Sequence, residues 1–192
     1  AVLGMRYANQ DAAGRLDLAL DTYIRNRIPR DAPITAVLVS LGNPAPAALL
    51  TAAVSGGAAA ARRWAGVLLT LGGTLTAVAI TELILKPLIG RLRYGHLSFP
   101  SGHTTAVCSV AITAALLLTT ARRPRSVALR VVASLTAILV SAGVAIALVA
   151  QHVHYATDTL AGCCVATATV PALALLLDSL ALHTRSDRSQ KS

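Results

Sequence analysis

Residues 126–150 read SVALRVVASLTAILVSAGVAIALVA, and Arg130 is the single charged residue of this stretch. A helix rises about 1.5 Å per residue, so a helix of this length crosses the roughly 30 Å hydrocarbon layer of a bilayer. The stretch therefore predicts a membrane-spanning helix. Other runs of the chain have the same character, which gives five predicted spans: residues 34–56, 64–85, 102–121, 126–150 and 159–182.

The composition of the whole chain agrees with a membrane protein. Hydrophobic residues make up 55% of the 192 residues, and the mean hydropathy is +0.64. The formal net charge of +9 raises the possibility of nucleic-acid binding, but such a surface interleaves basic with aromatic residues, and aromatic residues are only 3% here. The basic residues gather between the apolar runs, as in loops beside membrane spans. We expect an all-α polytopic bundle in a single domain over residues 1–192, with membrane lipids and no nucleic acid as partners.

The segments outside these runs have simpler patterns. Residues 12–28 alternate apolar and charged positions at helical spacing, which predicts an amphipathic helix lying in the membrane interface. Residues 1–5 are too short to span, and we interpret them as the end of a truncated first span. The motif NPAP at 43–46 predicts a kink, because proline interrupts helical hydrogen bonding. Residues 183–192 form a polar tail that we expect to be disordered.

Polar stretches interrupt the apolar pattern at three places. They are Lys86 to Arg93 with Arg91 between them, Phe99-Pro100-Ser101-Gly102-His103, and His154-Tyr155-Ala156-Thr157-Asp158. If all five runs cross the membrane, the loops at 86–101 and 151–158 lie on one face. The connections at 57–63 and 122–125 then lie on the other face, with the C-terminal tail. Parity therefore predicts that the three polar stretches meet on one side of the membrane.

The residue types in these stretches suit a phosphate group. Lysine and arginine bind phosphate oxygens, and a serine and glycine opening a helix create an anion site. His154 and Asp158 are four residues apart, so on a helix the carboxylate can hold one nitrogen of the ring. Each feature alone has a simpler interpretation: a basic cluster that meets lipid headgroups, a helix cap, or a structural hydrogen bond. Together they predict phosphoryl chemistry at a membrane surface.

This combination of motifs resembles the type-2 phosphatidic acid phosphatase family, which shares its site with the vanadium haloperoxidases. The family pattern is Lys-x6-Arg-Pro, then Pro-Ser-Gly-His, then Ser-Arg-x5-His-x3-Asp, and the resemblance covers about residues 64–182. Tyr94 replaces the proline, and Leu148 stands where the pattern has its third-motif arginine. Gln151, His152 or Arg91 could fill that gap, and we favour Arg91 for its charge.

The resemblance implies a mechanism without a cofactor. His154 would attack phosphorus and form a phosphohistidine, and Asp158 would fix its tautomer. His103 would protonate the leaving alkoxide and then activate water. The residues expected to bind phosphate are Lys86, Arg93, Ser101, Gly102 and Arg91. We expect no metal, because the carboxylates are too few for a magnesium or two-metal site.

The resemblance also limits the substrate and the alternatives. The substrates it allows are phosphatidate, phosphatidylglycerol phosphate, polyprenyl phosphate or pyrophosphate, and polyprenyl sugar phosphates. We expect the site on the external or periplasmic face of a bacterial plasma membrane. The two faces carry nearly equal numbers of basic residues, but a phosphate site needs Lys86, Arg91 and Arg93 wherever it lies, and without them the opposite face is the more basic. A catalytically impaired relative that binds lipid or a partner is one alternative. An anion transporter is another, with Glu82 as its best residue, although Glu82 can simply pair with Lys86 one turn later.

Overall fold

A computed structural model describes the backbone of residues 2–120 and 126–189 and the side chains of residues 4–120 and 126–181. Within these residues the fold is the predicted all-α bundle, with one small β-hairpin. The elements in chain order are α1 (Val2–Tyr7), α2 (Arg15–Arg25), α3 (Pro33–Leu41), α4 (Pro44–Ala60), α5 (Trp64–Ala79), the π-helix η1 (Ile80–Leu85), α6 (Lys86–Ile89), β1 (Leu92–Arg93), β2 (His96–Leu97), α7 (Gly102–Thr119), α8 (Val127–Ala150) and α9 (Ala156–Ser189).

Up to five segments of the described chain can cross a membrane. Four are single stretches of helix: Trp64–Ile89, Gly102–Thr119, Val127–Ala150 and Ala156–Ala181. The fifth combines α3 and α4, which are bent by 65° relative to each other. Pro44 is the first residue of α4 and lacks the N–H that a continuous helix would need. The predicted kink at 43–46 is confirmed.

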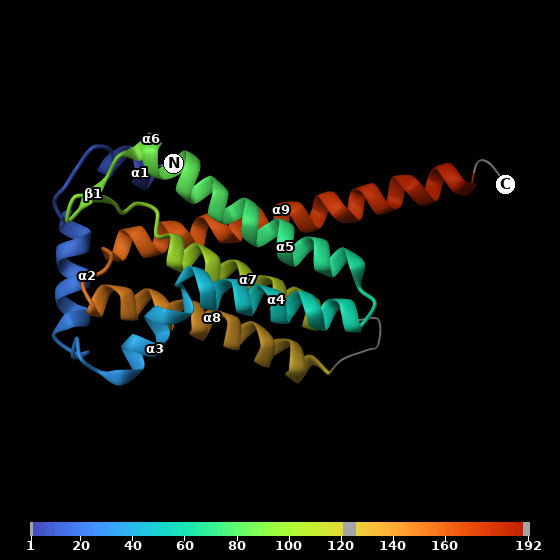
Figure 1. Cartoon of the computed structure of the whole chain (residues 1–192), viewed down its shortest axis with the longest axis horizontal. Helices are drawn as coiled ribbons and strands as arrows, with labels where there is room; N and C mark the ends of the chain where they lie inside the picture. The colour runs from blue at the N-terminus through green and yellow to red at the C-terminus, as the bar shows by residue number, and fades with distance from the viewer. Residues whose placement is uncertain (1, 121–125, 190–192) are drawn as a thin grey trace.

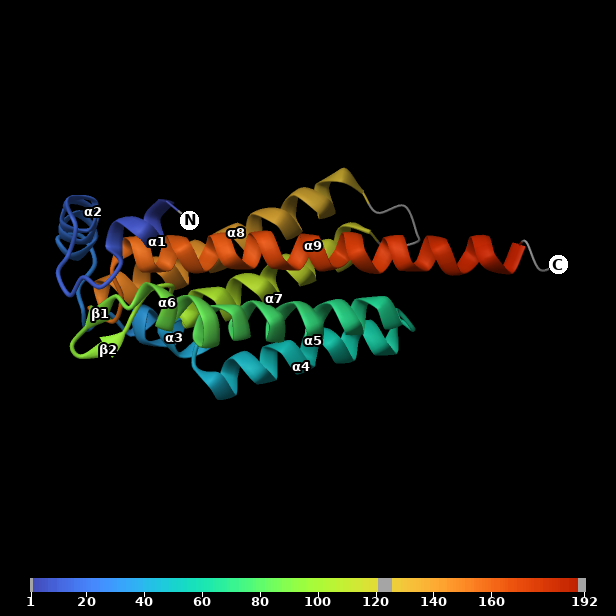
Figure 2. The same ribbon diagram turned by 90° about the horizontal axis from the view of Figure 1, so that it is seen from above.

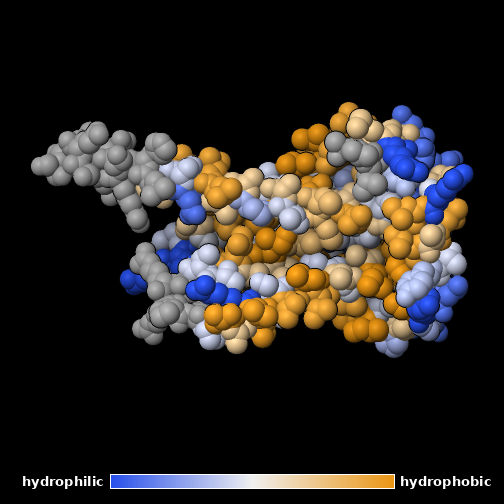
Figure 3. Space-filling model, turned by 180° about the vertical axis from the view of Figure 1, so that it is seen from behind, coloured by the Kyte–Doolittle hydropathy of each residue, from blue (hydrophilic) through white to orange (hydrophobic). Residues whose placement is uncertain are grey.

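The ends of the helices form two distinct faces (Figures 1 and 2). One end carries α2, α6, the hairpin and the junction between α8 and α9. The other end carries the turn from α4 to α5 and the last turns of α9. The flank seen in Figure 3 is largely apolar, and hydrophilic residues gather toward the ends. The predicted parity therefore holds for the loops at 57–63, 86–101 and 151–158, while 122–125 lies outside the described residues.

Residues 86–101 contain more structure than the predicted loop. The helix that begins as α5 continues through η1 and α6, and β1 and β2 follow as an antiparallel pair. Arg93 pairs with His96 across a two-residue turn. Tyr94 and Gly95 have φ angles of 50° and 78°, the left-handed values of a type I′ hairpin. The sequence gives a weak signal for this turn, because a bulky residue rarely adopts positive φ.

The predicted amphipathic helix is α2, which runs across one end of the bundle (Figures 1 and 2). Its leucines and Tyr23 are exposed, whereas Asp17 and Asp21 are buried. An interfacial helix turns its apolar residues toward lipid in this way. The acidic side of α2 therefore faces the protein.

The C-terminal segment corrects one expectation. α9 continues to Ser189, so most of residues 183–192 extend a helix where we expected disorder. Adding residues to an existing helix needs no new nucleation, which lets a polar segment remain helical. In Figure 1 this last part of α9 projects beyond the other helices.

Candidate active site

A cavity of about 920 Å³ opens between α4, α5, α7 and the hairpin. Most of its polar lining residues come from the end of the bundle that carries the hairpin: Glu82, Lys86, Arg93, Tyr94, His96, Ser98, His103, His152 and His154. Thr51 and Thr74 lie further along α4 and α5. Apolar side chains of α4 and α5 form much of the remaining wall, among them Ala48, Leu71 and Leu75. A cavity of this kind suits an amphiphile with a charged head and an apolar tail.

Two histidines meet in this cavity from separate elements. His103 is in the first turn of α7, and His154 is in the loop between α8 and α9. Their ring centroids are 6.0 Å apart, and the rings meet edge to face. The Nε2 atom of His103 is 3.0 Å from Oδ1 of Asn43, at the bend between α3 and α4. An amide oxygen only accepts hydrogen bonds, so this contact places a proton on Nε2 of His103.

His154 lies against the carboxylate of Asp158. Its Nδ1 atom is 3.5 Å from Oδ2 of Asp158, which is longer than a normal hydrogen bond, and Nδ1 has no other partner among the described residues. The same oxygen accepts a hydrogen bond from the backbone N–H of Tyr155 at 3.1 Å. Asp158 is fully buried. Because Nδ1 faces the carboxylate, Nε2 of His154 is the nitrogen left to react.

Lys86 enters the cavity from the helix that precedes the hairpin. Its Nζ atom is 2.8 Å from Oε2 of Glu82, so the predicted structural pair is present. The π-helical turn η1 contains Glu82, and such turns shift side chains relative to a regular helix. A Cβ atom on Gly102 would overlap with Oε1 of Glu82. A larger residue here would force the end of the Glu82 side chain to move, so glycine favours the close approach of α7 to the pair.

Arg93 is a buried cation with unused donors. The residue is 6% exposed, and its Nε and Nη1 atoms have no hydrogen-bond partner among the described residues. Its guanidinium lies over the ring of Tyr155, 4.0 Å from the centroid. A buried arginine with open N–H groups at a cavity wall is suited to binding an anion, because unpaired buried donors are costly.

Ser101 has the simpler role of a helix cap. It is fully buried, and its Oγ accepts a hydrogen bond from the backbone N–H of Thr104 at 3.3 Å. Its own N–H donates to the backbone oxygen of Asp158 at 2.9 Å. Ser101 does not line the cavity, whereas Gly102 does. The serine therefore joins the start of α7 to the start of α9.

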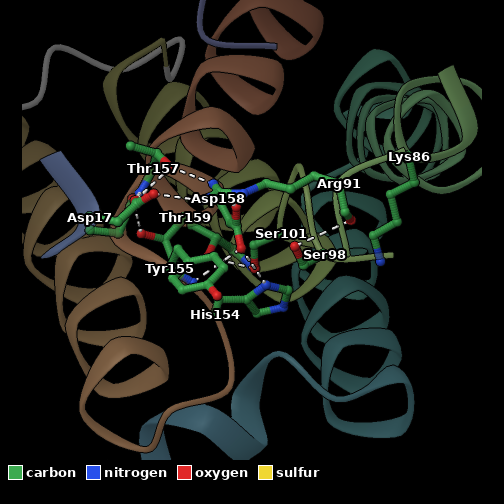
Figure 4. Close-up of polar contacts among 12 residues, drawn as sticks. Asp17, Lys86, Arg91, Ser98, Ser101, His154, Tyr155, Thr157, Asp158 and Thr159 are labelled. Atoms are coloured by element: carbon green, nitrogen blue, oxygen red, sulfur yellow. Dashed lines mark hydrogen bonds and ion pairs between the residues drawn. The ribbon is translucent and has the colours of Figure 1, made fainter. Parts of the chain in front are cut away.

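Arg91 lies behind the cavity (Figure 4). It is fully buried, and its guanidinium contacts Asp17 at 2.5 Å and Asp158 at 2.7 Å. The two carboxylates hold the charge that we expected to bind phosphate. The geometry thus favours a positioning role for Arg91.

Leu148, which stands where the family pattern has its third-motif arginine, lies in the apolar core. Leu148 is fully buried and packs with Val107 and Val144. Of the other residues considered for the gap, Gln151 donates to the hydroxyl of Thr35 at 3.1 Å, and His152 lines the cavity. Burial lowers the pKa of His152, and nearby arginines lower it further. His152 is therefore neutral at pH 7 and offers a hydrogen bond but no charge.

Some residues of the site carry no clear signal in the sequence. Asn43 contacts His103 from 60 positions away, and its sequence context indicates only a kink. His96 and Ser98 reach the cavity because of the hairpin, which the sequence pattern does not predict. Asp17 looks like one charge on an amphipathic helix, and only its contacts show that it belongs to the cluster behind the cavity.

The comparisons agree with this geometry. The family model described as the PAP2 superfamily matches residues 92–180. This segment contains Arg93, His103, His154 and Asp158, and Lys86 lies just before it. Neither the curated proteins nor the solved structures give a significant match. The family indicates a phosphatase that acts on phosphate esters, and the apolar helices fit a membrane protein. Residues 92–180 of this chain are therefore similar to the PAP2 superfamily, and the motifs of the site lie within this segment or just before it.

Proposed function

We propose that this protein is an integral-membrane lipid phosphatase that hydrolyses a phosphomonoester or pyrophosphate head group through a phosphohistidine. The observation that carries the proposal is the pair of imidazoles, with ring centroids 6.0 Å apart, beside the open donors of Arg93 in a cavity with apolar walls. We further propose that residues 1–192 act as one membrane-embedded domain.

In the first step, Nε2 of His154 attacks phosphorus. The new P–N bond forms as the P–O bond to the lipid breaks, and His103 gives a proton to the departing oxygen. The lipid leaves as an alcohol or, from a pyrophosphate, as a monophosphate. Asp158 stabilises the positive charge that develops on the His154 ring.

In the second step, water removes the phosphoryl group from His154. His103, now unprotonated, takes a proton from the water as its oxygen attacks phosphorus. The P–N bond breaks, its electron pair returns to His154, and inorganic phosphate leaves. Both histidines are then in their starting states.

The cations of the site bind the phosphoryl oxygens in this mechanism. Lys86, Arg93 and the N–H groups at the start of α7 supply positive charge where negative charge develops, and such electrostatic stabilisation usually contributes most to the rate of an enzymatic reaction. The proposed reaction needs no metal, because these side chains take that electrostatic role. Arg91 and Ser101 act indirectly, through Asp158 and the first turn of α7.

The apolar walls between α4 and α5 support a lipid substrate, since a tail can lie there with its phosphate at the polar end. Phosphatidate, phosphatidylglycerol phosphate, polyprenyl phosphates and polyprenyl sugar phosphates all have this form. We place the site on the external or periplasmic side of a bacterial plasma membrane, from the distribution of the remaining basic residues.

A second candidate function is a catalytically impaired relative that binds lipid phosphate without releasing it. Leu148 favours this alternative, because it fills the core where the family pattern has a phosphate-binding arginine. The transporter alternative loses support, because Glu82 is paired with Lys86.

Phosphate release by the purified protein tests the proposal. Each lipid phosphate is assayed in EDTA and again with added Mg²⁺, with orthovanadate as a phosphate mimic and His154→Ala as the inactive control. We expect release in EDTA, inhibition by vanadate, and no release by His154→Ala. Activity that requires Mg²⁺ would contradict the metal-independent mechanism. Binding of vanadate without release from any substrate would favour the impaired relative.

A further inference from the structure

The buried side of α2 is acidic and holds the start of α9. Asp17 and Asp21 are 0% and 2% exposed. Asp17 accepts hydrogen bonds from the backbone N–H and the hydroxyl of Thr157, at 3.0 and 2.7 Å. Asp21 accepts a hydrogen bond from the backbone N–H of Ala156 at 3.0 Å. Carboxylates at a helix N-terminus accept hydrogen bonds from the free N–H groups and interact favourably with the helix dipole. The acidic side of α2 therefore stabilises the first turn of α9.

Arg91 connects this helix cap to the site. Its Nη2 atom contacts Asp17 at 2.5 Å and its Nη1 atom contacts Asp158 at 2.7 Å, as Figure 4 shows. The guanidinium is stacked between the rings of Tyr7 and Tyr155, 4.3 Å from each centroid. All three charged side chains are fully buried. The arginine therefore has a single fixed orientation between the two carboxylates.

The two oxygens of Asp158 face different partners. Oδ1 accepts a hydrogen bond from Arg91, and Oδ2 faces Nδ1 of His154 at 3.5 Å. Oδ2 also accepts a hydrogen bond from the N–H of Tyr155, so its direction depends on that bond and on how Arg91 holds Oδ1. The second carboxylate also matters for charge: Asp17, Arg91 and Asp158 together carry a net charge of −1, whereas Arg91 and Asp158 alone would be neutral.

The charge on Asp17 is maintained at neutral pH. Burial raises the pKa of Asp17, but hydrogen bonds from Arg91 and Thr157 outweigh that effect and leave the pKa below its ordinary value. Asp17 thus remains an anion while the protein is folded. Asp21 differs, since burial raises the pKa of its carboxyl and its arginine partner is Arg25, on the same helix.

We propose that Asp17 and Arg91 are positioning residues, which aim the Asp158 carboxylate at His154 and leave the buried cluster one negative charge to stabilise the His154 cation. This inference rests on the proposed phosphatase function. It assigns to the interfacial helix α2 an indirect part in the reaction, through Arg91 and Asp158, in addition to its contact with lipid.

The test compares variants of the full-length protein in detergent. Asp17→Asn keeps the shape of the side chain and removes its charge. Thr157→Val removes the hydroxyl that contacts both Arg91 and Asp17, and Thr157→Ser restores it. Asp21→Asn is the matched control, because it removes a buried carboxylate from the same helix without contacting Arg91 or Asp158.

The first readout separates kcat from KM for hydrolysis of p-nitrophenyl phosphate. We expect Asp17→Asn and Thr157→Val to lower kcat by about 10- to 100-fold, with little change in KM. This is the range found when residues that orient metal-binding histidines are replaced, and we expect a similar loss for a histidine nucleophile. Thr157→Ser and Asp21→Asn should keep the kcat of the wild type. Thermal unfolding identifies any variant that does not fold, and Thr157→Val replaces Asp17→Asn if the latter fails.

The second readout does not depend on turnover. In ¹⁵N-histidine-labelled protein, the signals of His154 are assigned by their loss in His154→Ala. We expect the wild type and Asp21→Asn to hold the proton on Nδ1, and Asp17→Asn and Thr157→Val to show a mixture of tautomers.

The outcomes distinguish this inference from the proposed function. If the wild type releases no phosphate but the tautomer shifts in Asp17→Asn, the phosphatase function fails and the positioning role stands. If the wild type is active and Asp17→Asn matches Asp21→Asn in both kcat and tautomer, the positioning role is overturned.

Discussion

Arg91 and Arg93 flank a single residue and have opposite surroundings. Both are buried, but the first is paired with two carboxylates while the second keeps open donors at the cavity wall. Residues two apart on a regular strand point to the same side, but Arg91 lies before β1 and follows Gly90, which has a φ angle of 64°. This turn and the contacts with Asp17 and Asp158 hold Arg91 behind the cavity, while Arg93 lines it. Side-chain direction, rather than charge, separates their roles.

This difference gives a prediction at the scale of single residues. Arg91→Ala leaves two buried carboxylates without their counter-ion, and we expect it to lower the free energy of unfolding by about 3–5 kcal/mol. Arg93→Ala removes a side chain that lies over the Tyr155 ring but has no carboxylate partner among the described residues, so the stability should fall less. Transition-state stabilisation should instead fall by about 2–4 kcal/mol. Thermal unfolding and kcat/KM, measured for both variants, check this. A stable Arg91→Ala protein that has lost vanadate binding would instead identify Arg91 as a phosphate ligand.

A second prediction concerns the proton from His103. We expect His103→Ala to lower the hydrolysis of an alkyl lipid phosphate by about 10²- to 10⁴-fold, because an alkoxide needs a proton in order to leave. p-Nitrophenolate leaves without one, so the same variant should lose much less activity on p-nitrophenyl phosphate. Rates on the two substrates, with His154→Ala as the inactive control, measure the difference. Equal losses on both would mean that His103 does not act as the acid.

At the scale of elements, the hairpin places Arg93 through its turn. Gly95 has φ +78° and open space around its Cβ position, so Gly95→Ala acts through backbone strain alone. We expect a cost of about 1–2 kcal/mol and weaker vanadate binding, because Arg93 lies directly before the turn. Gly56 also has open space but no positive φ, and it lies within α4. Gly56→Ala should therefore stabilise the protein without changing vanadate binding. Identical binding by the two variants would show that the turn does not position Arg93.

At the scale of the whole molecule, the two ends of the bundle should face opposite sides of the membrane. Tyr94→Cys marks the end with the cavity, and Ala61→Cys marks the turn between α4 and α5; both are introduced after Cys108, Cys163 and Cys164 are replaced by alanine. A membrane-impermeant maleimide should label Tyr94→Cys in intact cells and Ala61→Cys only after permeabilisation. The reverse pattern would place the site on the cytoplasmic side, and labelling of both in intact cells would contradict the parity of the spans.

Features that depend on neighbouring residues could be predicted from the sequence. Apolar runs of sufficient length predict spans whatever surrounds them, and Pro44 breaks a helix because of its own missing N–H. The parity of the spans then brings the three polar stretches to one end. The pairing of Glu82 with Lys86 could be predicted for the same reason, since residues four apart share a helix face.

Features that depend on distant residues were decided by the tertiary structure. Asp17 and Arg91 are 74 positions apart, and Asn43 is 60 positions from His103. No local pattern distinguishes an arginine held by carboxylates from one that awaits a phosphate. The partner of a buried charge is the group that the packing of other elements brings within reach, and here the packing of α2 on α9 made that choice. The sequence by itself determined the spans and which residues gather at one end, whereas the fold determined which of them face the cavity.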